Sequence, residues 1–121
     1  MAKGESAGQF EQAVLTAIVT LGEAAYGVTI HQKVEALLRP KKVALGAVYV
    51  TLDRLEGKKF ISSWLTEPTP ERGGRSKRCY RMEDAGVRAL EESAVVARRI
   101  WDTLREEWSD RRDRKWGKAW Q

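Results

Sequence analysis

The residues best suited to a specific chemistry are cations that gather in one short segment. After Glu71 this segment contains no further acidic residue and carries Arg72, Arg75, Lys77, Arg78 and Arg81. Guanidinium and ammonium groups attract phosphate oxygens, so this composition predicts contact with the backbone of a polyanion. The alternative is a solvated surface hairpin whose positive charge keeps its edge from pairing with other strands.

Groups for catalysis or metal binding are scarce by comparison. The chain has one histidine, His31, and one cysteine, Cys79, and neither stands in a known motif spacing. The Gly73-Gly74 pair lacks the lysine and the following helix of a phosphate-binding loop. A single cysteine excludes an intramolecular disulfide, and there is no Cys/His cluster to hold a metal. The sequence therefore predicts a protein that is not an enzyme and has no cofactor or metal.

The overall composition also favours a polyanionic partner. The 121 residues carry a formal net charge of +5, and the pI is near 9.6. No uninterrupted apolar run approaches the roughly 18 residues of a membrane span, and the start, MAKGESAG, lacks the apolar core of a signal peptide. We therefore expect a soluble, cytoplasmic protein that does not associate with membranes.

The element that would position a binding surface runs from Leu45 to Ile61. Its apolar residues recur at helical spacing and predict a core-facing stripe made by Leu45, Val48, Leu52 and Leu55. The opposite side has small side chains where the helix begins and charged ones where it ends. It consists of Gly46, Val50, Asp53 and Gly57 and is bordered by Ala47, Thr51, Arg54 and Lys58. Such a helix fits into a groove. Taken alone, the pattern is equally that of an amphipathic helix with a solvated outer face.

Two further helices are predicted before this stretch. One apolar stripe runs from Phe10 to Leu21 and is followed by Gly22, where a left-handed residue would end a helix. A second stripe follows the Tyr26-Gly27 pair and is ended by Pro40. The link from Pro40 to Leu45 is so short that the second and third helices must cross tightly, as a helix-turn-helix requires.

A hairpin is predicted after the third helix. The segments FISSWL (60–65) and KRCYRM (77–82) are rich in residues that favour strands. Between them, TEPTPERGGRS contains two prolines and a glycine pair, which predict an irregular loop. A strand, loop and strand after a third helix form the wing of a winged helix, and the wing then carries the cations after Glu71.

From Glu83 onward the pattern changes to one long helix. Apolar residues alternate steps of three and four, as in the seam of a coiled coil: Val87, Leu90, Ala94, Ala97, Trp101, Leu104 and Trp108. We interpret it as a dimerisation helix and add Phe10 and Val14 to the predicted dimer interface. The alternative is a helix folded back onto its own monomer.

The predicted fold class is mainly α with a small β-hairpin, namely a winged helix-turn-helix plus a long C-terminal dimerisation helix. Its parts are a mobile tail at 1–8, a winged helix domain at 9–82, the dimerisation helix at 83–112 and a disordered tail at 113–121. That last segment is basic and carries Trp116 and Trp120, so contact with a partner is its alternative role.

The strings LGAVYVTLDRLEGKKFISSW and EPTPERGGRSKRCYRMEDAG closely resemble the PadR-like winged helix transcriptional regulators, particularly the short subgroup with one C-terminal helix. The likeness covers about residues 8 to 108. Its specific parts are Tyr26-Gly27, the wing string from Glu71 through Tyr80 to Gly86, and Gly46, Tyr49, Leu52, Arg54 and Leu55 in the third helix. The resemblance implies a homodimeric DNA-binding repressor whose third helix enters the major groove while the wing contacts backbone or minor groove.

By position, the resemblance places Tyr49, Thr51 and Arg54 on a recognition helix. In a major groove, Ala47 and Val50 suit thymine methyl groups, while Thr51 and Arg54 suit hydrogen bonds to bases or phosphates. The predicted contacts to double-stranded DNA are Lys42, Ala47, Tyr49, Val50, Thr51, Arg54, Arg72, Arg75, Lys77 and Arg78. Two recognition helices about 34 Å apart would read an inverted repeat.

The resemblance also implies a ligand and leaves one other function open. Some short relatives respond to planar or aromatic molecules near the dimer helices, which draws attention to Trp101 and Trp108 as an effector site. The alternative is that both side chains simply fill the seam. A different class of function is a protein-interaction module that uses the seam and the basic wing without specific DNA binding.

Two positions depart from the family pattern. Ala44 stands where many relatives place a serine that caps the third helix. Lys59 stands where relatives usually carry glycine, so we expect the turn into Phe60 to be strained or shifted.

Overall fold

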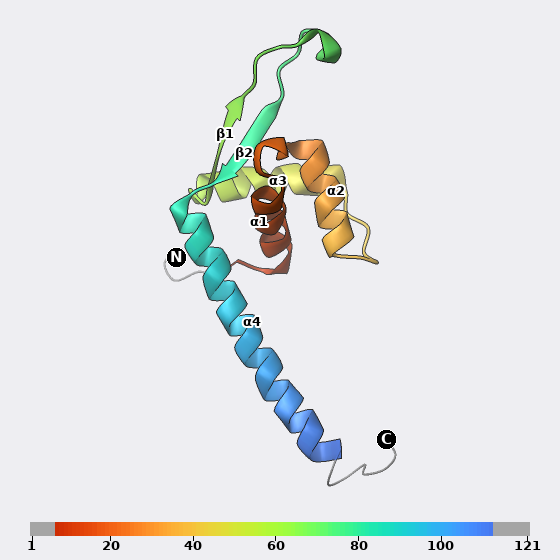
Figure 1. Cartoon of the computed structure of the whole chain (residues 1–121), viewed down its shortest axis with the longest axis vertical. Helices are drawn as coiled ribbons and strands as arrows, with labels where there is room; N and C mark the ends of the chain where they lie inside the picture. Colours follow the sequence, from red (N-terminus) through yellow and green to blue (C-terminus); the bar gives the residue numbers. More distant parts are fainter. Residues whose placement is uncertain (1–6, 113–121) are drawn as a thin grey trace.

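The computed structural model describes residues 7–112. Figure 1 shows the shorter helices grouped beside a hairpin, with a long helix leading away from them. The elements are α1 (Gln9–Leu21), η1 (Gly22–Ala24), α2 (Gly27–Leu37), α3 (Leu45–Gly57), β1 (Ile61–Leu65), η2 (Pro70–Arg72), β2 (Arg78–Met82) and α4 (Asp84–Arg111). This order confirms the predicted fold class. Residues 1–6 and 113–121, which hold most of the two predicted tails, lie outside the described residues.

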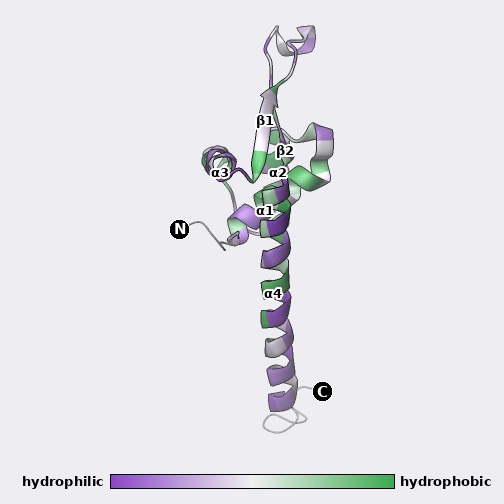
Figure 2. Cartoon of the chain, turned by 90° about the vertical axis from the view of Figure 1, so that its left-hand side faces the viewer, coloured by the Kyte–Doolittle hydropathy of each residue, from purple (hydrophilic) through white to green (hydrophobic). Residues whose placement is uncertain are grey.

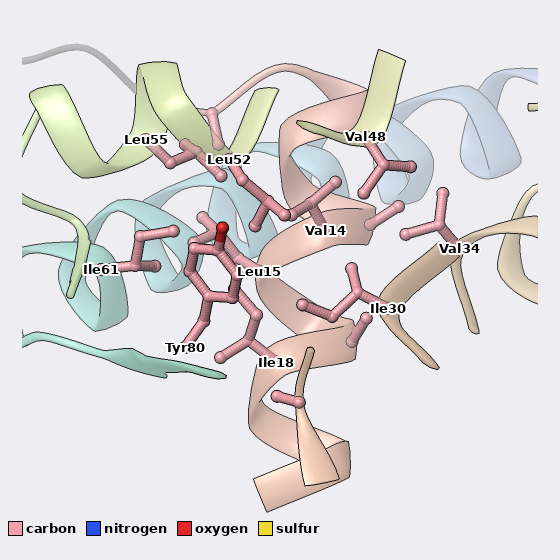
Figure 3. Close-up of a cluster of buried hydrophobic side chains, with 14 residues drawn as sticks. Val14, Leu15, Ile18, Ile30, Val34, Val48, Leu52, Leu55, Ile61 and Tyr80 are labelled. Atoms are coloured by element: carbon pink, nitrogen blue, oxygen red, sulfur yellow. The ribbon is translucent and has the colours of Figure 1, made fainter. Parts of the chain in front are cut away.

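One apolar core joins α1, α2, α3 and the root of the hairpin (Figure 3). Most of the predicted stripe residues face this core, but Leu37 and Leu45 are exposed and Leu15, outside the predicted stripe, is buried. The fully buried side chains include Val14, Leu15, Ile30, Val34, Val48, Leu52, Leu55 and Ile61. Burial of each such side chain contributes roughly 1.5–3 kcal/mol. The prediction that Val14 lies in a dimer interface is wrong, because Val14 is 0% exposed within its own protomer.

The hairpin is tied to the start of α2 by a third, very short strand segment. β1 and β2 pair antiparallel, from Ile61 opposite Met82 to Leu65 opposite Arg78. Beside β2, Tyr26 forms an antiparallel bridge with Cys79, and the Tyr80 N–H donates to the Ala25 carbonyl at 2.9 Å. The direction of the wing therefore depends on the loop before α2 as well as on β1. In the connecting loop, Pro70–Arg72 form one 3-10 turn within the segment predicted to be irregular.

The end of α3 closes with a left-handed residue that is not glycine. The Phe60 N–H donates to the Leu55 carbonyl and the Lys59 N–H to the Glu56 carbonyl, each at 3.0 Å, which is the Schellman arrangement. Lys59 has φ +67° and is the only non-glycine residue with positive φ among residues 7–112. The strain predicted at the turn into Phe60 is thus located at Lys59, where a side chain costs about 1–2 kcal/mol relative to a relaxed backbone.

Replacing Lys59 with glycine should stabilise the fold. Glycine removes the left-handed penalty, although its freedom in the unfolded chain offsets part of the gain, so the free energy of unfolding should rise by about 1 kcal/mol. Thermal unfolding followed by circular dichroism should show a midpoint higher by several degrees. Lys59→Ala is the matched control, because it removes the charge and keeps the Cβ atom. An equal gain in both variants would assign the effect to charge instead of backbone strain.

The first turns of α4 pack on the domain and also hold the described start of the chain. Gly86, Ala89 and Ser93 are buried. The Ser93 hydroxyl accepts from the Ala7 N–H and donates to the Ala7 carbonyl, both at 3.0 Å. Gln12 Nε2 donates to the same carbonyl at 2.8 Å. The prediction of a mobile tail at 1–8 is therefore wrong at Ala7, which is 4% exposed, because hydrogen bonds with Ser93 and Gln12 anchor it.

Beyond Ser93, α4 leaves the domain and keeps apolar side chains in solvent. Large residues exposed along this part are Val95, Val96, Ile100, Trp101 and Trp108. Figure 2 shows apolar and hydrophilic residues alternating along α4 below the domain. The helix does not fold back onto its own monomer. Among residues 7–112, no helix is both long and apolar enough to cross a membrane.

Candidate nucleic-acid interface

The turn between α2 and α3 is held by side chains of α2. His31 Nε2–H donates to the Val43 carbonyl at 2.6 Å, and the Val43 N–H donates to Glu35 Oε2 at 3.1 Å. Ala44 occupies the N-cap of α3 and makes no side-chain cap hydrogen bond, as its type predicts. The two bonds to Val43 fix the chain one residue earlier, so the start of α3 is positioned from α2.

This turn also exposes cations. Lys42, which was predicted to contact DNA, is exposed, and so are Arg39 and Lys41. Arg39 and Lys41 were not among the predicted DNA contacts, although the string RPKK shows their charge in the sequence. A basic helix-helix turn beside the start of α3 is suited to a phosphate contact.

The outer face of α3 is exposed as its pattern predicts, and two residues of the helix differ from the prediction. The exposed residues include Gly46, Ala47, Tyr49, Val50, Asp53, Arg54 and Gly57. Thr51 is only 3% exposed, so its predicted contact with DNA is wrong. Thr51 lies three residues after Val48 and four before Leu55, which turns it toward the core stripe. Conversely, Leu45 was predicted to face the core and is 38% exposed.

Tyr49 braces α3 against the first residue of α2. A Cβ atom at Gly27 would lie 2.5 Å from Tyr49 Cζ and 2.7 Å from Tyr49 Cε1, well inside van der Waals contact. In its present position the ring leaves no room for a Cβ atom at residue 27, which links two motif positions that are far apart in sequence. Tyr49 remains 44% exposed, so its other surface is free to face a ligand.

Arg54 forms an ion pair with a carboxylate on α1. Its Nη1 lies 3.7 Å from Glu11 Oε2, and Lys58 Nζ lies 3.3 Å from the same oxygen. The Glu11 side chain is only 13% exposed, whereas Arg54 is about half exposed. Sequence reasoning missed Glu11, because no local pattern relates it to α3. This ion pair draws Arg54 toward α1.

The wing cations are partly held by the domain. Arg78 Nη1–H donates to Ser63 Oγ at 3.0 Å, and the Ser63 hydroxyl donates to Glu56 Oε2 of α3 at 2.8 Å. Lys77 Nζ lies 4.0 Å from the centroid of the Tyr26 ring, a cation–π contact. These contacts orient the root of the wing before any ligand binds.

The outer part of the wing carries the remaining predicted cations. Arg75 is exposed after Gly73 and Gly74, whose φ angles of 65° and 79° allow the tight turn. Arg72 ends η2, and its side chain lies outside the described part of the structure. The loop thus carries charge beyond the strands, on the side of the domain away from α4 (Figure 1).

The pKa of Tyr80 depends on charged groups where α3 meets the wing. Burial raises the pKa of the Tyr80 hydroxyl above its usual value, Arg78 lowers it, and Glu56 and Asp53 raise it further. The hydroxyl therefore stays neutral at physiological pH. The two α3 carboxylates lie near enough to the wing root to act on it.

Apart from the buried Val14, the residues predicted for a dimer interface divide into three groups. Val87, Ala94, Ala97, Trp101 and Trp108 are exposed, Leu90 and Leu104 are half-buried, and Phe10 is half-buried against the core. Ile100 is 63% exposed and was not in the predicted interface. The heptad pattern omitted it because it falls between seam positions.

Trp101 and Trp108 form a pair on this surface. Their ring centroids are 6.1 Å apart at an interplanar angle of 87°, an edge-to-face contact. The Arg105 guanidinium lies 5.9 Å from the Trp101 ring centroid and is held by Asp102 Oδ1 at 2.6 Å. The pair is a half-exposed aromatic surface with a cation at its edge.

A helix-turn-helix with an exposed third helix and a basic hairpin beside it defines a winged helix protein of the DNA-binding class. The family model of the transcriptional regulator PadR-like family matches residues 14–92. The chain belongs to this family, which confirms the resemblance found in the sequence. The family consists of transcriptional regulators and is not a class of enzymes.

Solved structures with the same fold include three regulators. A PadR family regulator from Clostridium difficile is 20% identical, has a TM-score of 0.66, and covers 84% of this chain and 99% of its own. A PadR-like regulator from Bacillus cereus is 23% identical, with TM-score 0.66 and coverage of 81% and 89%. One from Eggerthella lenta is 21% identical, with TM-score 0.62 and coverage of 78% and 80%. Curated proteins gave no match.

Proposed function

We propose that this protein represses transcription by binding an inverted-repeat operator as a homodimer. The observation that carries the proposal is the exposed face of α3 beside a basic wing whose root is fixed to α3 through Arg78, Ser63 and Glu56. The helix supplies a surface for base edges, and the wing supplies charge for the backbone.

Cations on both sides of α3 support contact with duplex DNA. Arg39, Lys41 and Lys42 lie on the turn before α3, and Arg75 and Arg78 lie on the wing after it. A helix inserted in the major groove has a sugar-phosphate strand on each side, so charge is needed at both ends of the surface.

The apolar surface of α4 supports the homodimer. Beyond Ser93 this helix exposes Ile100, Trp101 and Trp108 in one chain, which is unfavourable unless a partner covers them. A second copy presents the same stripe, and a two-fold pair would set two α3 helices about 34 Å apart, one turn of DNA. One recognition helix alone reads too few base pairs for useful specificity.

Binding to the DNA upstream of the gene tests the proposal. The full chain should bind a labelled upstream duplex much more tightly than a scrambled duplex of equal length, measured by fluorescence anisotropy. Footprinting should then show two protected half-sites related by a two-fold axis. Equal affinity for both duplexes would exclude the regulator and favour a protein-interaction module.

A small planar or aromatic effector is part of the proposal. The Trp101–Trp108 pair offers two ring faces for stacking, next to the surface assigned to the second copy. A ligand that separates these rings changes the packing of α4 and thereby the spacing of the α3 helices, which relieves repression.

Trp101→Ala should abolish the fluorescence response to such a ligand. A panel of planar aromatic compounds is titrated while tryptophan emission is followed. Trp64→Ala is the control, because Trp64 lies on the hairpin and stacks with Arg81, 5.4 Å from its ring centroid. A response retained in Trp101→Ala and equal to that of the unaltered chain would remove Trp101 from the site.

A further inference from the structure

One unpaired carboxylate lies in the middle of the outer face of α3. The groove-facing stripe consists of Gly46, Val50, Asp53 and Gly57, all exposed. Asp53 is its only charged member, and no partner for its carboxylate is found among residues 7–112. Its neighbours are otherwise engaged, because Arg54 pairs with Glu11 and Glu56 accepts from Ser63.

Among residues 7–112, neither a close contact nor the backbone angle requires glycine at either end of this stripe. A Cβ atom at Gly46 or Gly57 would meet nothing within 4 Å, and neither residue has a positive φ. Glycine is nevertheless unfavourable in a helix. At about 1.5 Å per residue the two lie about 16 Å apart along α3. Between them, Val50 and Asp53 are the side chains that this stripe presents to solvent.

The chemistry of a carboxylate restricts what it can meet in the major groove. An ionised carboxylate only accepts hydrogen bonds. Guanine presents two acceptors in the major groove, and adenine pairs its amino group with an acceptor, whereas cytosine presents the N4 amino donor. Phosphates repel the group. A carboxylate on the groove floor thus selects cytosine.

We propose that Asp53 determines specificity by accepting a hydrogen bond from N4 of a cytosine in each half-site, while Val50 contacts a thymine methyl group within one or two base pairs. This inference rests on the proposed DNA-binding function and identifies the sequence it reads. Asp53 was predicted to lie on this face but was not among the predicted DNA contacts.

Asp53→Asn and Asp53→Ala test the inference through base preference. The unaltered chain should select cytosine at one position of each half-site from a randomised duplex library. An asparagine side chain pairs with adenine through its amide, so Asp53→Asn should switch that position to adenine, and Asp53→Ala should lose the preference there. The discrimination expected at that position is on the order of tenfold. Because Asp53 is exposed, both variants should unfold at an unchanged temperature.

The control is Asp84→Asn, which removes the same charge at the exposed start of α4 and should leave the base preference unchanged. The rival role for Asp53 is a repulsive charge that weakens binding to all DNA. If both Asp53 variants bind every sequence more tightly with an unaltered preference, the inference is overturned while the proposed function stands. If the unaltered chain selects no sequence at all, the proposed function itself fails.

Discussion

Replacing Ile100 with glutamate is expected to convert the proposed homodimer to a monomer and to weaken binding to the proposed operator on the order of a thousandfold. Ile100 is 63% exposed, lies two turns after the buried Ser93 on the same side of α4, and is one turn before Leu104. Pairing two copies through this side would bury a carboxylate without a partner. The isolated monomer keeps its own core intact, because Ile100 contributes nothing to it.

Val95→Glu provides the matched control for this prediction. Val95 is 51% exposed on the other side of α4, so a charge there should leave the dimer intact. Sedimentation equilibrium gives the mass of each variant, and anisotropy gives its affinity for the two-half-site duplex. Thermal unfolding checks that both remain folded. An Ile100→Glu protein that stays dimeric, or a monomer with full operator affinity, would contradict the assembly proposed for α4.

The helices were predictable because periodicity states which side of each helix is apolar. Val48, Leu52 and Leu55 are all fully buried as their spacing requires. The burial of residues on the border of a stripe is harder to predict, because rotating the helix about its axis by a few tens of degrees buries or exposes them. Thr51 failed for that reason, and Val14 failed because an apolar stripe does not say whether its own chain or a partner covers it.

The parts of the site that depend on local composition could be predicted from the sequence. The parts that depend on contacts between residues far apart in the chain could not. The wing cations stand out as a run without acids. Glu11 beside Arg54, and the Tyr26–Cys79 bridge that ties the wing to α2, join segments far apart in sequence, and no local pattern encodes them. The anchoring of Ala7 by Ser93 is of the same kind. The Lys59 turn was predictable because a positive φ has a strong residue preference.

Operator affinity should fall steeply with salt, and the wing should account for a defined part of that fall. If six to ten phosphates are neutralised, the affinity drops on the order of a thousandfold or more between about 50 and 200 mM salt. Removing Arg75 and Arg78 together takes away two exposed cations of the wing. The slope of log affinity against log salt should therefore become shallower by about two, equally on operator and scrambled duplexes.

The double variant Arg98→Ala/Arg99→Ala tests whether the change in salt dependence comes from the position of the lost cations or from the loss of net charge. Both side chains are exposed on α4, far along the chain from the wing, and the double variant loses the same charge. Release of counterions requires close contact between cation and phosphate, whereas a change in net charge acts at long range and is screened within about 10 Å at 0.1 M salt. The α4 variant should keep the full slope. Equal slopes in the two double variants would mean that the wing does not touch the backbone, and DNA binding would then have to rest on α3 and the Arg39–Lys42 turn.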